Sequence, residues 1–394
     1  MLRERGRLSR RRFLQGAAAA LAAVASGLPW TKESDHAEAA DKLITKVSRP
    51  YDAETPVEAF ASWITPNDRF FVRSHFGPPP EEQINPATWR LQVHGLIERP
   101  LTLSLDELKQ LPEVTITAVL QCSGNGRAFY RPRVPGVQWE RGAVGNARWT
   151  GVRLADVLKR AGVQPSARHF QMQGADRPIS TKVPLFVRSM PLEKALHPDT
   201  LLAYRMNGEP LPLLHGAPLR VIAPGWMADA CLKWLTTLTV SAEEAKGFYM
   251  EKAYRYPDRP VQPGTAVSRH EMKPVEAMVV KSLIVAPAQG SIVGPGPVTI
   301  RGVAWTGEDS RIARVEVSTD DGRTWTPAHL LGDDLPYAWR QWQIVWQPKV
   351  TGRAVILCRA TDDRGQTQPP ASPWNPGGFL WNGTDLVQVD VRRT

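Results

Sequence analysis

The chain has 394 residues, of which 42% are hydrophobic and 22% are charged. This composition is typical of a globular protein, and the length favours two or three domains over a single core. The formal net charge is +10, but no run of basic residues follows residue 40, which disfavours nucleic-acid binding. After the N-terminal region no stretch of about eighteen apolar residues occurs, so no membrane span is expected.

Residues 1–40 have the pattern of an export signal. Three consecutive arginines, Arg10 to Arg12, precede Phe13 and Leu14, and a mild apolar run covers residues 16–24. The run is too short and too rich in alanine to span a bilayer. Ala37-Glu38-Ala39 offers a cleavage site with small residues. We therefore predict a twin-arginine signal peptide over residues 1–40, with the mature protein in the periplasm.

The chain contains three cysteines, Cys122, Cys231 and Cys358. An odd number in an oxidising compartment leaves at least one of them free or occupied by a ligand. Cys358 lies in an alternating strand and Cys231 lies beside Leu232 and Trp234, so both are predicted to be small core residues. The sequence has no Cys-x-x-Cys-His motif, so no c-type haem is expected in this chain.

Cys122 stands where a predicted strand meets a predicted turn. Residues 115–121 alternate apolar and β-branched side chains, whereas residues 123–126 are Ser-Gly-Asn-Gly. A strand end would hold the sulfur firmly and leave one side open to a ligand, and the two glycines would let the backbone approach a bulky group. Arg127 is expected to favour the thiolate. The alternative is a buried structural cysteine.

Further candidate residues lie at predicted strand ends and turns. Within residues 65–75 we expect a short strand that places Arg73 and His75 on one face, where they would suit an oxyanion or a phosphate. His215, Arg220 and Lys233 also lie near strand ends or turns, where ligands commonly bind.

Patterns of strands and helices alternate unevenly up to about residue 240. A strand is predicted over Trp89–Gly95, a capping box joins Ser104 to Glu107 in a helix that reaches Leu111, and a second helix covers Leu154–Ala161 and ends at Gly162. We found no dinucleotide-binding or phosphate-cradling glycine motif. Residues 41–271 are therefore predicted to form a mixed α+β domain rather than a doubly wound one.

Residues 272–394 have a different pattern. Short alternating strands are predicted over residues 298–304, 314–318, 342–346, 354–360 and 387–391, with turns such as Asp321-Gly322 between them. This spacing is typical of an immunoglobulin-like β-sandwich. We found no cluster of titratable residues in this region, so we expect an interaction or dimerisation module.

Taken together, ordered motifs over roughly residues 55–394 resemble the sulfite oxidase family of molybdenum enzymes. The motifs are FFVRSH, LQCSGNGR, WERGAVGNARWTGVRL, MNGEPLPLLHGAPLRV, CLKWL, ARVEVSTDDGRTW and RATDDRG. The resemblance implies that Cys122 is the protein ligand of a molybdenum ion that is also held by one molybdopterin. It implies that the pterin and its phosphate are bound by Phe71, Arg73, His75, Asp176, His215, Arg220 and Lys233. It also implies a sulfite pocket containing Arg73, Arg127 and Tyr254, with Trp139 as a possible wall.

The implied reaction is the oxidation of sulfite to sulfate, with the arginines neutralising the substrate's charge and Tyr254 donating a hydrogen bond. Animal members carry a haem domain that this sequence lacks, so a separate c-type cytochrome is the expected electron acceptor. A homodimer through the β-sandwich is also expected. Two departures concern the site: Ser74 replaces a common asparagine, and Leu386 is aligned with an arginine that reaches the substrate pocket.

Three alternatives remain open at this stage. The sulfane dehydrogenase subunit of thiosulfate oxidation and assimilatory nitrate reductase share parts of the pattern, although Tyr254 and the motif of residues 142–154 favour sulfite. A non-enzymatic secreted binding protein would have no use for Cys122 beside Arg127.

Overall fold

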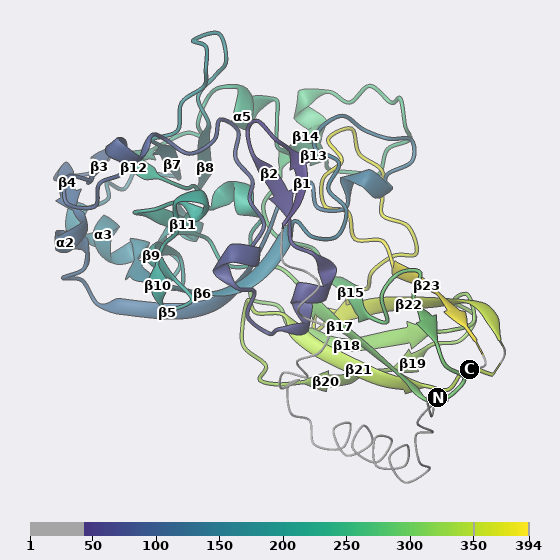
Figure 1. The fold of residues 1–394 in the computed structure, drawn as a ribbon. Helices are drawn as coiled ribbons and strands as arrows, with labels where there is room; N and C mark the ends of the chain where they lie inside the picture. Colours follow the sequence, from purple (N-terminus) through teal and green to yellow (C-terminus); the bar gives the residue numbers. More distant parts are fainter. Residues whose placement is uncertain (1–42, 350, 393–394) are drawn as a thin grey trace.

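The computed structural model describes residues 43–349 and 351–392, and Figure 1 shows two lobes of different character. Sheets and short helices make up the N-terminal lobe, whereas strands make up the C-terminal lobe. The predicted α+β class is thereby confirmed. The predicted signal peptide lies outside the described residues and stays a prediction. Within the described ranges, no helix is long and apolar enough to cross a membrane.

The first sheet of the N-terminal lobe is antiparallel and carries Cys122 at the end of β5. Its strand order is β10-β9-β6-β5, and β11 pairs with β9. The strands are β5 (Glu113–Gln121), β6 (Val144–Arg153), β9 (Leu201–Met206), β10 (Glu209–Pro210) and β11 (Arg220–Ile222). β5 pairs with β6 along its whole length in antiparallel register, and Figure 1 shows this pair of strands extending between the N-terminal lobe and the C-terminal lobe. The predicted strand before Cys122 is confirmed.

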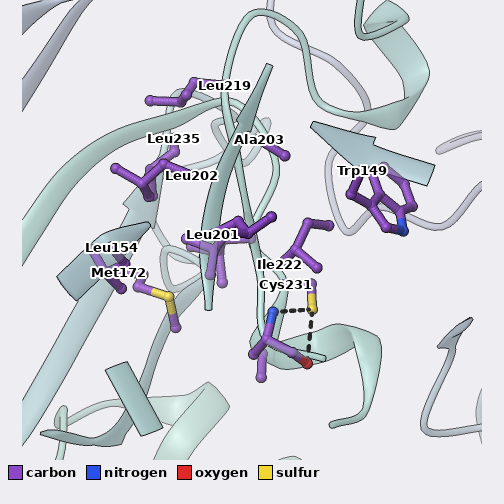
Figure 2. Close-up of a cluster of buried hydrophobic side chains, with 14 of the residues drawn as sticks. Trp149, Leu154, Met172, Leu201, Leu202, Ala203, Leu219, Ile222, Cys231 and Leu235 are labelled. Carbon is purple, nitrogen blue, oxygen red and sulfur yellow. Dashed lines mark hydrogen bonds between the residues drawn. The ribbon is translucent and has the colours of Figure 1, made fainter. Parts of the chain in front are cut away.

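The second sheet has the order β4-β3-β12-β7-β8, and only β3 and β12 within it are parallel. Its strands are β3 (Arg90–Gly95), β4 (Leu101–Ser104), β7 (His169–Gly174), β8 (Val187–Pro191) and β12 (Leu235–Ser241). One hydrophobic core joins the two sheets. Figure 2 shows part of it, in which Ile222 lies beside Cys231, and Met172 and Leu154 lie on the other side of the cluster. The sulfur of Cys231 accepts a hydrogen bond from the Ala223 N–H at 3.2 Å.

The helices are short. They are α2 (Leu105–Leu108), α3 (Leu154–Ala161), α4 (Leu192–Leu196) and α5 (Phe248–Glu251). Two of them, α2 and α3, were predicted from the sequence. Ser104 and Glu107 form the predicted capping box of α2, although this helix ends before Leu111. Gly162 ends α3 at a φ of +74°, a left-handed conformation that favours glycine.

Irregular segments connect the sheets. The 3₁₀ turns are η1 (Val57–Ala61), η2 (Asn67–Arg69), η3 (Glu81–Gln83), η4 (Arg127–Phe129), η5 (Leu213–His215), η6 (Ala228–Ala230) and η7 (Arg269–Glu271). Two small hairpins pair β1 (Ile44–Val47) with β2 (Asp52–Glu54), and β13 (Arg255–Pro257) with β14 (Met272–Pro274). The short strand predicted within residues 65–75 is wrong, because only Val72 of this stretch pairs with another segment, through an isolated bridge to Ala53. This bridge uses a neighbour that is remote in sequence, so local alternation could not reveal it.

The C-terminal lobe is a sandwich of two sheets, β15-β17-β21-β20 and β16-β23-β22-β18-β19. Its strands are β15 (Lys281–Ala286), β16 (Ile292–Val293), β17 (Val298–Trp305), β18 (Ile312–Ser318), β19 (Thr326–Pro327), β20 (His329–Leu331), β21 (Arg340–Trp346), β22 (Gly352–Asp362) and β23 (Asp385–Val391). Residues from both sheets, including Trp342, Ile356 and Cys358, form the core between them. The five predicted strands are confirmed, as is the core position of Cys358.

The expectation that this lobe lacks a titratable cluster is wrong. Lys281 and Asp385 are both buried in it, and Asp385 forms an ion pair with Arg141 of the N-terminal lobe at 3.0 Å. Burial lowers the pKa of Lys281 to about 7. Lys281 and Asp385 come from strands that are remote in sequence, so the cluster exists only in the fold.

A separate hydrophobic cluster packs the sandwich against the sheet that carries Cys122. It includes Phe60 and Val119 from the N-terminal lobe and Trp305 and Trp339 from the sandwich. At its edge, the Trp305 Nε1–H donates a 2.7 Å hydrogen bond to the side-chain oxygen of Gln121, the residue before Cys122. The sandwich therefore supports the end of β5 directly.

This support can be tested by Trp305→Phe, which removes the N–H and leaves the buried Gln121 oxygen without its donor. We expect the free energy of unfolding to fall by about 1–3 kcal/mol, measured from denaturant midpoints. Trp325→Phe is the control, because it removes an equivalent N–H from a half-buried indole bonded to the Gly322 carbonyl. Equal effects of the two substitutions would contradict the special role of the Trp305 hydrogen bond.

Candidate active site

The thiol of Cys122 faces a pocket of about 750 Å³, including its open mouth. Residues from segments far apart in the sequence line it. Nine of the residues proposed from the sequence are among them: Phe71, Arg73, His75, Cys122, Asp176, His215, Arg220, Lys233 and Tyr254. The two remaining candidates, Arg127 and Trp139, do not line it. The fold therefore gathers most of the predicted site into one place, whatever the role of each residue.

Cys122 is held by its backbone and buried at its side chain. Its N–H donates to the Ala143 carbonyl at 2.9 Å, and its carbonyl accepts from Asn125 N–H at the same distance. The residue is 8% exposed, and burial raises the pKa of its thiol, whereas the charges of Arg73 and Arg127 act in the opposite direction. Arg127 thus favours the thiolate as expected, but burial outweighs it, so a bound metal would be needed to hold the sulfur deprotonated.

Arg127 lies behind the cysteine turn, packed against carbonyl groups and not in the pocket lining. It donates to Val137 at 3.1 Å and to the Gly377 carbonyl through two nitrogens at 3.1 and 3.3 Å. A Cβ at Gly124 would lie 2.6 Å from its guanidinium, and a Cβ at Gly126 would lie 2.7 Å from the Trp381 indole. The two glycines of the turn do admit bulky groups, as predicted, and these groups are side chains of the protein itself.

Trp139 is fully buried in the core of the N-terminal lobe and does not wall the pocket. Its carbonyl accepts from Ala128 N–H at 3.0 Å, so it braces the segment that follows Arg127. The sequence could not show whether Trp139 lies in the core or in the pocket wall, because a tryptophan near a turn suits either place.

A chain of polar contacts runs from Asp52 to Tyr254. Asp52 forms a 3.0 Å ion pair with Arg73 and accepts the Ser74 N–H at 3.0 Å. Arg73 donates to Nδ1 of His75 at 3.1 Å, and Nε2 of His75 lies 2.8 Å from the Tyr254 hydroxyl. Because a guanidinium only donates, Nδ1 is the acceptor and the Nε2–H of the neutral imidazole donates to Tyr254. The hydroxyl proton of Tyr254 is then free to point into the pocket.

The protonation states agree with this arrangement. Burial, followed by the charges of Arg73 and Arg188, lowers the pKa of His75 to about 2, so the imidazole is neutral. Burial also raises the pKa of Tyr254 to about 12, so its hydroxyl keeps its proton. Tyr254 therefore offers a hydrogen-bond donor to the pocket across the neutral pH range.

Tyr254 is held in place by several elements. Its φ is +54°, an uncommon conformation for an aromatic residue that persists when the surroundings enforce it. Its carbonyl accepts the Val275 N–H at 2.8 Å, its ring stacks on Phe379 with 5.5 Å between centroids, and the Arg188 guanidinium lies 5.0 Å from its ring centre. Phe379 thus lets the C-terminal lobe help to hold the Tyr254 ring in place.

The other end of the pocket is cationic. Arg220 is buried and donates to the carbonyls of His215 and Cys231, while its Nε has no partner among the described residues. Lys233 donates to the Leu214 carbonyl at 2.8 Å, and burial, followed by the charge of Arg220, lowers its pKa to about 7. Asp176 lies nearby, and burial raises its pKa to about 6. Such incompletely compensated positive charge suits a bound anion such as a phosphate.

Several site residues escaped the sequence analysis. Three of them line the pocket: Ser123, Phe186 and Asp229. Four others contact site residues from outside the lining: Asp52, Arg188, Gly377 and Phe379. Asp229 and Arg188 are charged residues within largely apolar stretches, which was an available signal, but only the fold shows that they pair. Leu386, aligned with a pocket arginine, is 38% exposed on β23 and does not line the pocket. The sandwich segment that meets Arg127 is Gly377–Phe379 instead.

The depressed pKa of His215 predicts a pH dependence of stability. Burial lowers this pKa to about 3, so below the ordinary value of 6.5 the unfolded chain binds a proton that the folded chain does not. Relative to His215→Gln, which can still donate to the Asn67 carbonyl, the original protein should lose roughly 2 kcal/mol of stability between pH 7 and pH 5. Denaturant unfolding of both proteins in the same cofactor state measures this difference, and parallel pH profiles would contradict it.

Two family models match the chain. Residues 76–249 match the oxidoreductase molybdopterin binding domain, and residues 272–391 match the Mo-co oxidoreductase dimerisation domain. The mitochondrial sulfite oxidase of Mus musculus is 38% identical over 87% of this chain, and the match spans 64% of that protein's length. The sulfite oxidase of Arabidopsis thaliana is 33% identical over 86% of this chain and 91% of its own length.

The fold comparison agrees with these sequence matches. The sulfane dehydrogenase SoxCD from Paracoccus pantotrophus has a chain that superimposes with a TM-score of 0.77 and 28% identity, covering 92% of this chain and 94% of its own length. The similarity thus covers both lobes. The chain belongs to the sulfite oxidase family of molybdopterin oxidoreductases.

Proposed function

We propose that this protein is an exported sulfite dehydrogenase, which oxidises sulfite to sulfate and passes the electrons to a separate c-type cytochrome. The overall reaction converts sulfite and water to sulfate, two protons and two electrons. The observation that carries the proposal is the opening of the Cys122 thiol into a pocket that also presents Arg73 and the Tyr254 hydroxyl. The sulfite oxidases among its relatives support the choice of substrate.

The pocket fits a molybdenum–molybdopterin cofactor in three respects. Thiolate sulfur is a suitable ligand for a soft redox metal, and Cys122 supplies one at a rigid position. No group of three or more His, Cys, Asp or Glu residues that could hold a metal occurs in the described part of the chain, so the pterin would provide the remaining ligands. Arg220, with its unpartnered Nε, and Lys233 would hold the pterin's phosphate.

When bound, the cofactor supplies the two-electron redox change and the oxygen transfer to sulfur. The residues of this chain bind and orient the substrate around it. Arg73 lines the pocket and is oriented by Asp52, so its remaining N–H groups can bind a sulfite oxygen. Tyr254 donates its hydroxyl proton, since His75 already bonds to the oxygen's lone pair. Arg127 acts from behind the cysteine turn as a fixed positive charge.

Location, acceptor and assembly belong to the proposal as well. The twin-arginine pattern of residues 9–15 supports export to the periplasm. Export supports a periplasmic c-type cytochrome as acceptor, and the sequence itself has no Cys-x-x-Cys-His motif for attaching a haem. The match of residues 272–391 to a dimerisation domain supports a homodimer formed through the sandwich.

A second candidate is a sulfane dehydrogenase activity on a sulfur atom carried by a partner protein. The overlap with the SoxCD chain over most of both chains favours it. The same pocket residues would serve either substrate, so the choice between the two candidates is made by assay.

The two candidates differ in one assay. Holoenzyme recovered after export should contain about one molybdenum per chain and reduce a c-type cytochrome rapidly with free sulfite, because one metal centre per pocket carries the chemistry. The control is Cys122→Ser protein, which should show no sulfite-dependent rate. If sulfite does not accelerate cytochrome reduction but a protein-bound sulfane sulfur does, the sulfite proposal is wrong and the second candidate holds.

A further inference from the structure

A buried ion pair adjoins the pocket, and the function proposed above assigns it no role. Arg188, from β8, donates to the Asp229 carboxylate, from η6, with 2.5 Å between Nη2 and Oδ2. Both side chains are almost completely inaccessible to solvent. Asp229 lines the pocket, whereas Arg188 lies behind it. Desolvating two charges is costly, so a pair in this position adds little to stability over well-packed apolar residues.

The carboxylate end of the pair reaches the cysteine turn. The Ser123 hydroxyl donates a short hydrogen bond to Oδ1 of Asp229. Ser123 follows Cys122 directly, and its carbonyl accepts the Leu380 N–H from the sandwich at 3.0 Å. Asp229 holds the side chain of the residue next to the thiol, and the sandwich segment holds its carbonyl.

The guanidinium end of the pair reaches the tyrosine. The Arg188 guanidinium lies 5.0 Å from the centre of the Tyr254 ring, a cation–π distance. Another of its nitrogens donates to the Tyr249 carbonyl. The Tyr249 ring packs on His75 with 4.7 Å between centroids, and His75 is the residue that bonds to the Tyr254 hydroxyl.

We propose that the Arg188–Asp229 pair is a positioning unit that holds the Cys122 turn and the Tyr254 ring in fixed relation to each other. One planar guanidinium and one carboxylate connect them, although they belong to segments more than a hundred residues apart in the sequence. The Asp229 carboxylate accepts hydrogen bonds from both Arg188 and Ser123, whereas Arg188 contacts Tyr254 through the face of its ring. Displacements of about 1 Å between reacting groups can cost about a hundredfold in rate, so such a unit has a catalytic purpose.

The first test compares Arg188→Met with Arg141→Gln. The control removes the cation of another ion pair, between the partly buried Arg141 and the buried Asp385, which lies outside the pocket. We expect Arg188→Met holoenzyme to keep its molybdenum and lose about tenfold or more in kcat/KM for sulfite, since the ring and the turn are no longer aligned. Arg141→Gln should show a comparable fall in the denaturant midpoint with kcat/KM retained within about twofold.

A double variant separates positioning from stability. Arg188→Met leaves the Asp229 charge buried without its partner, and adding Asp229→Leu removes that charge. We expect the double variant to recover the denaturant midpoint but not kcat/KM. Recovery of both would overturn the proposal, because the pair would then matter only for stability. Activity loss fully explained by lost molybdenum would overturn it too.

The activity test rests on the proposed function, so a second readout that does not depend on the substrate is needed. Holoenzyme reduced with titanium(III) citrate gives an electron paramagnetic resonance signal that is sensitive to the geometry of the cysteine ligand. We expect the g values to shift in Arg188→Met and not in Arg141→Gln. If the original protein does not oxidise sulfite, the proposed function fails and this comparison alone decides the positioning role. An unchanged signal in Arg188→Met would overturn the proposal.

Discussion

The structure depends on one constraint: hydrogen bonds hold both the N–H and the carbonyl of Cys122, while its sulfur stays open to a pocket. β5 pairs with β6 up to Gln121, and the Cys122 N–H continues this pairing to Ala143. On the other side, Trp305 bonds to Gln121. Because both lobes hold this one strand end, the sandwich supports the site mechanically in addition to any role in assembly.

Electrostatics imposes a second constraint on the pocket. Burial raises the pKa of the Cys122 thiol, lowers the pKa of Lys233 to about 7 and lowers that of His75 to about 2. All three shifts disfavour the charged form, which is the expected cost of burying polar groups. A bound anionic cofactor would offset part of this cost at Lys233, and a metal would do so at Cys122. The site therefore gains stability when it is filled.

The sequence predicted those parts of the fold that local patterns encode. The strand before Cys122, the capped helix at Ser104, the end of α3 at Gly162 and the sandwich strands all follow from periodicity and turn residues. Cys122, His215, Arg220 and Lys233 were found near predicted strand ends or turns, whereas Phe71, Asp176 and Tyr254 were assigned to the site only through the family resemblance. The errors concern tertiary contacts: Arg127 and Trp139 lie behind the pocket, and the segment from Arg73 to His75 is held by Asp52 and Tyr254 and not by strand pairing. Paired partners such as Arg188 and Asp229 could be known only from the fold.

The central claim is that the sulfur of Cys122 binds a molybdenum ion in this pocket. Extended X-ray absorption fine structure at the molybdenum edge tests it directly, because the method counts the sulfur neighbours of the metal. The account predicts one sulfur neighbour fewer in Cys122→Ser than in the original protein. An equal number of sulfur neighbours in the two proteins, or the absence of molybdenum from properly exported protein, would contradict it.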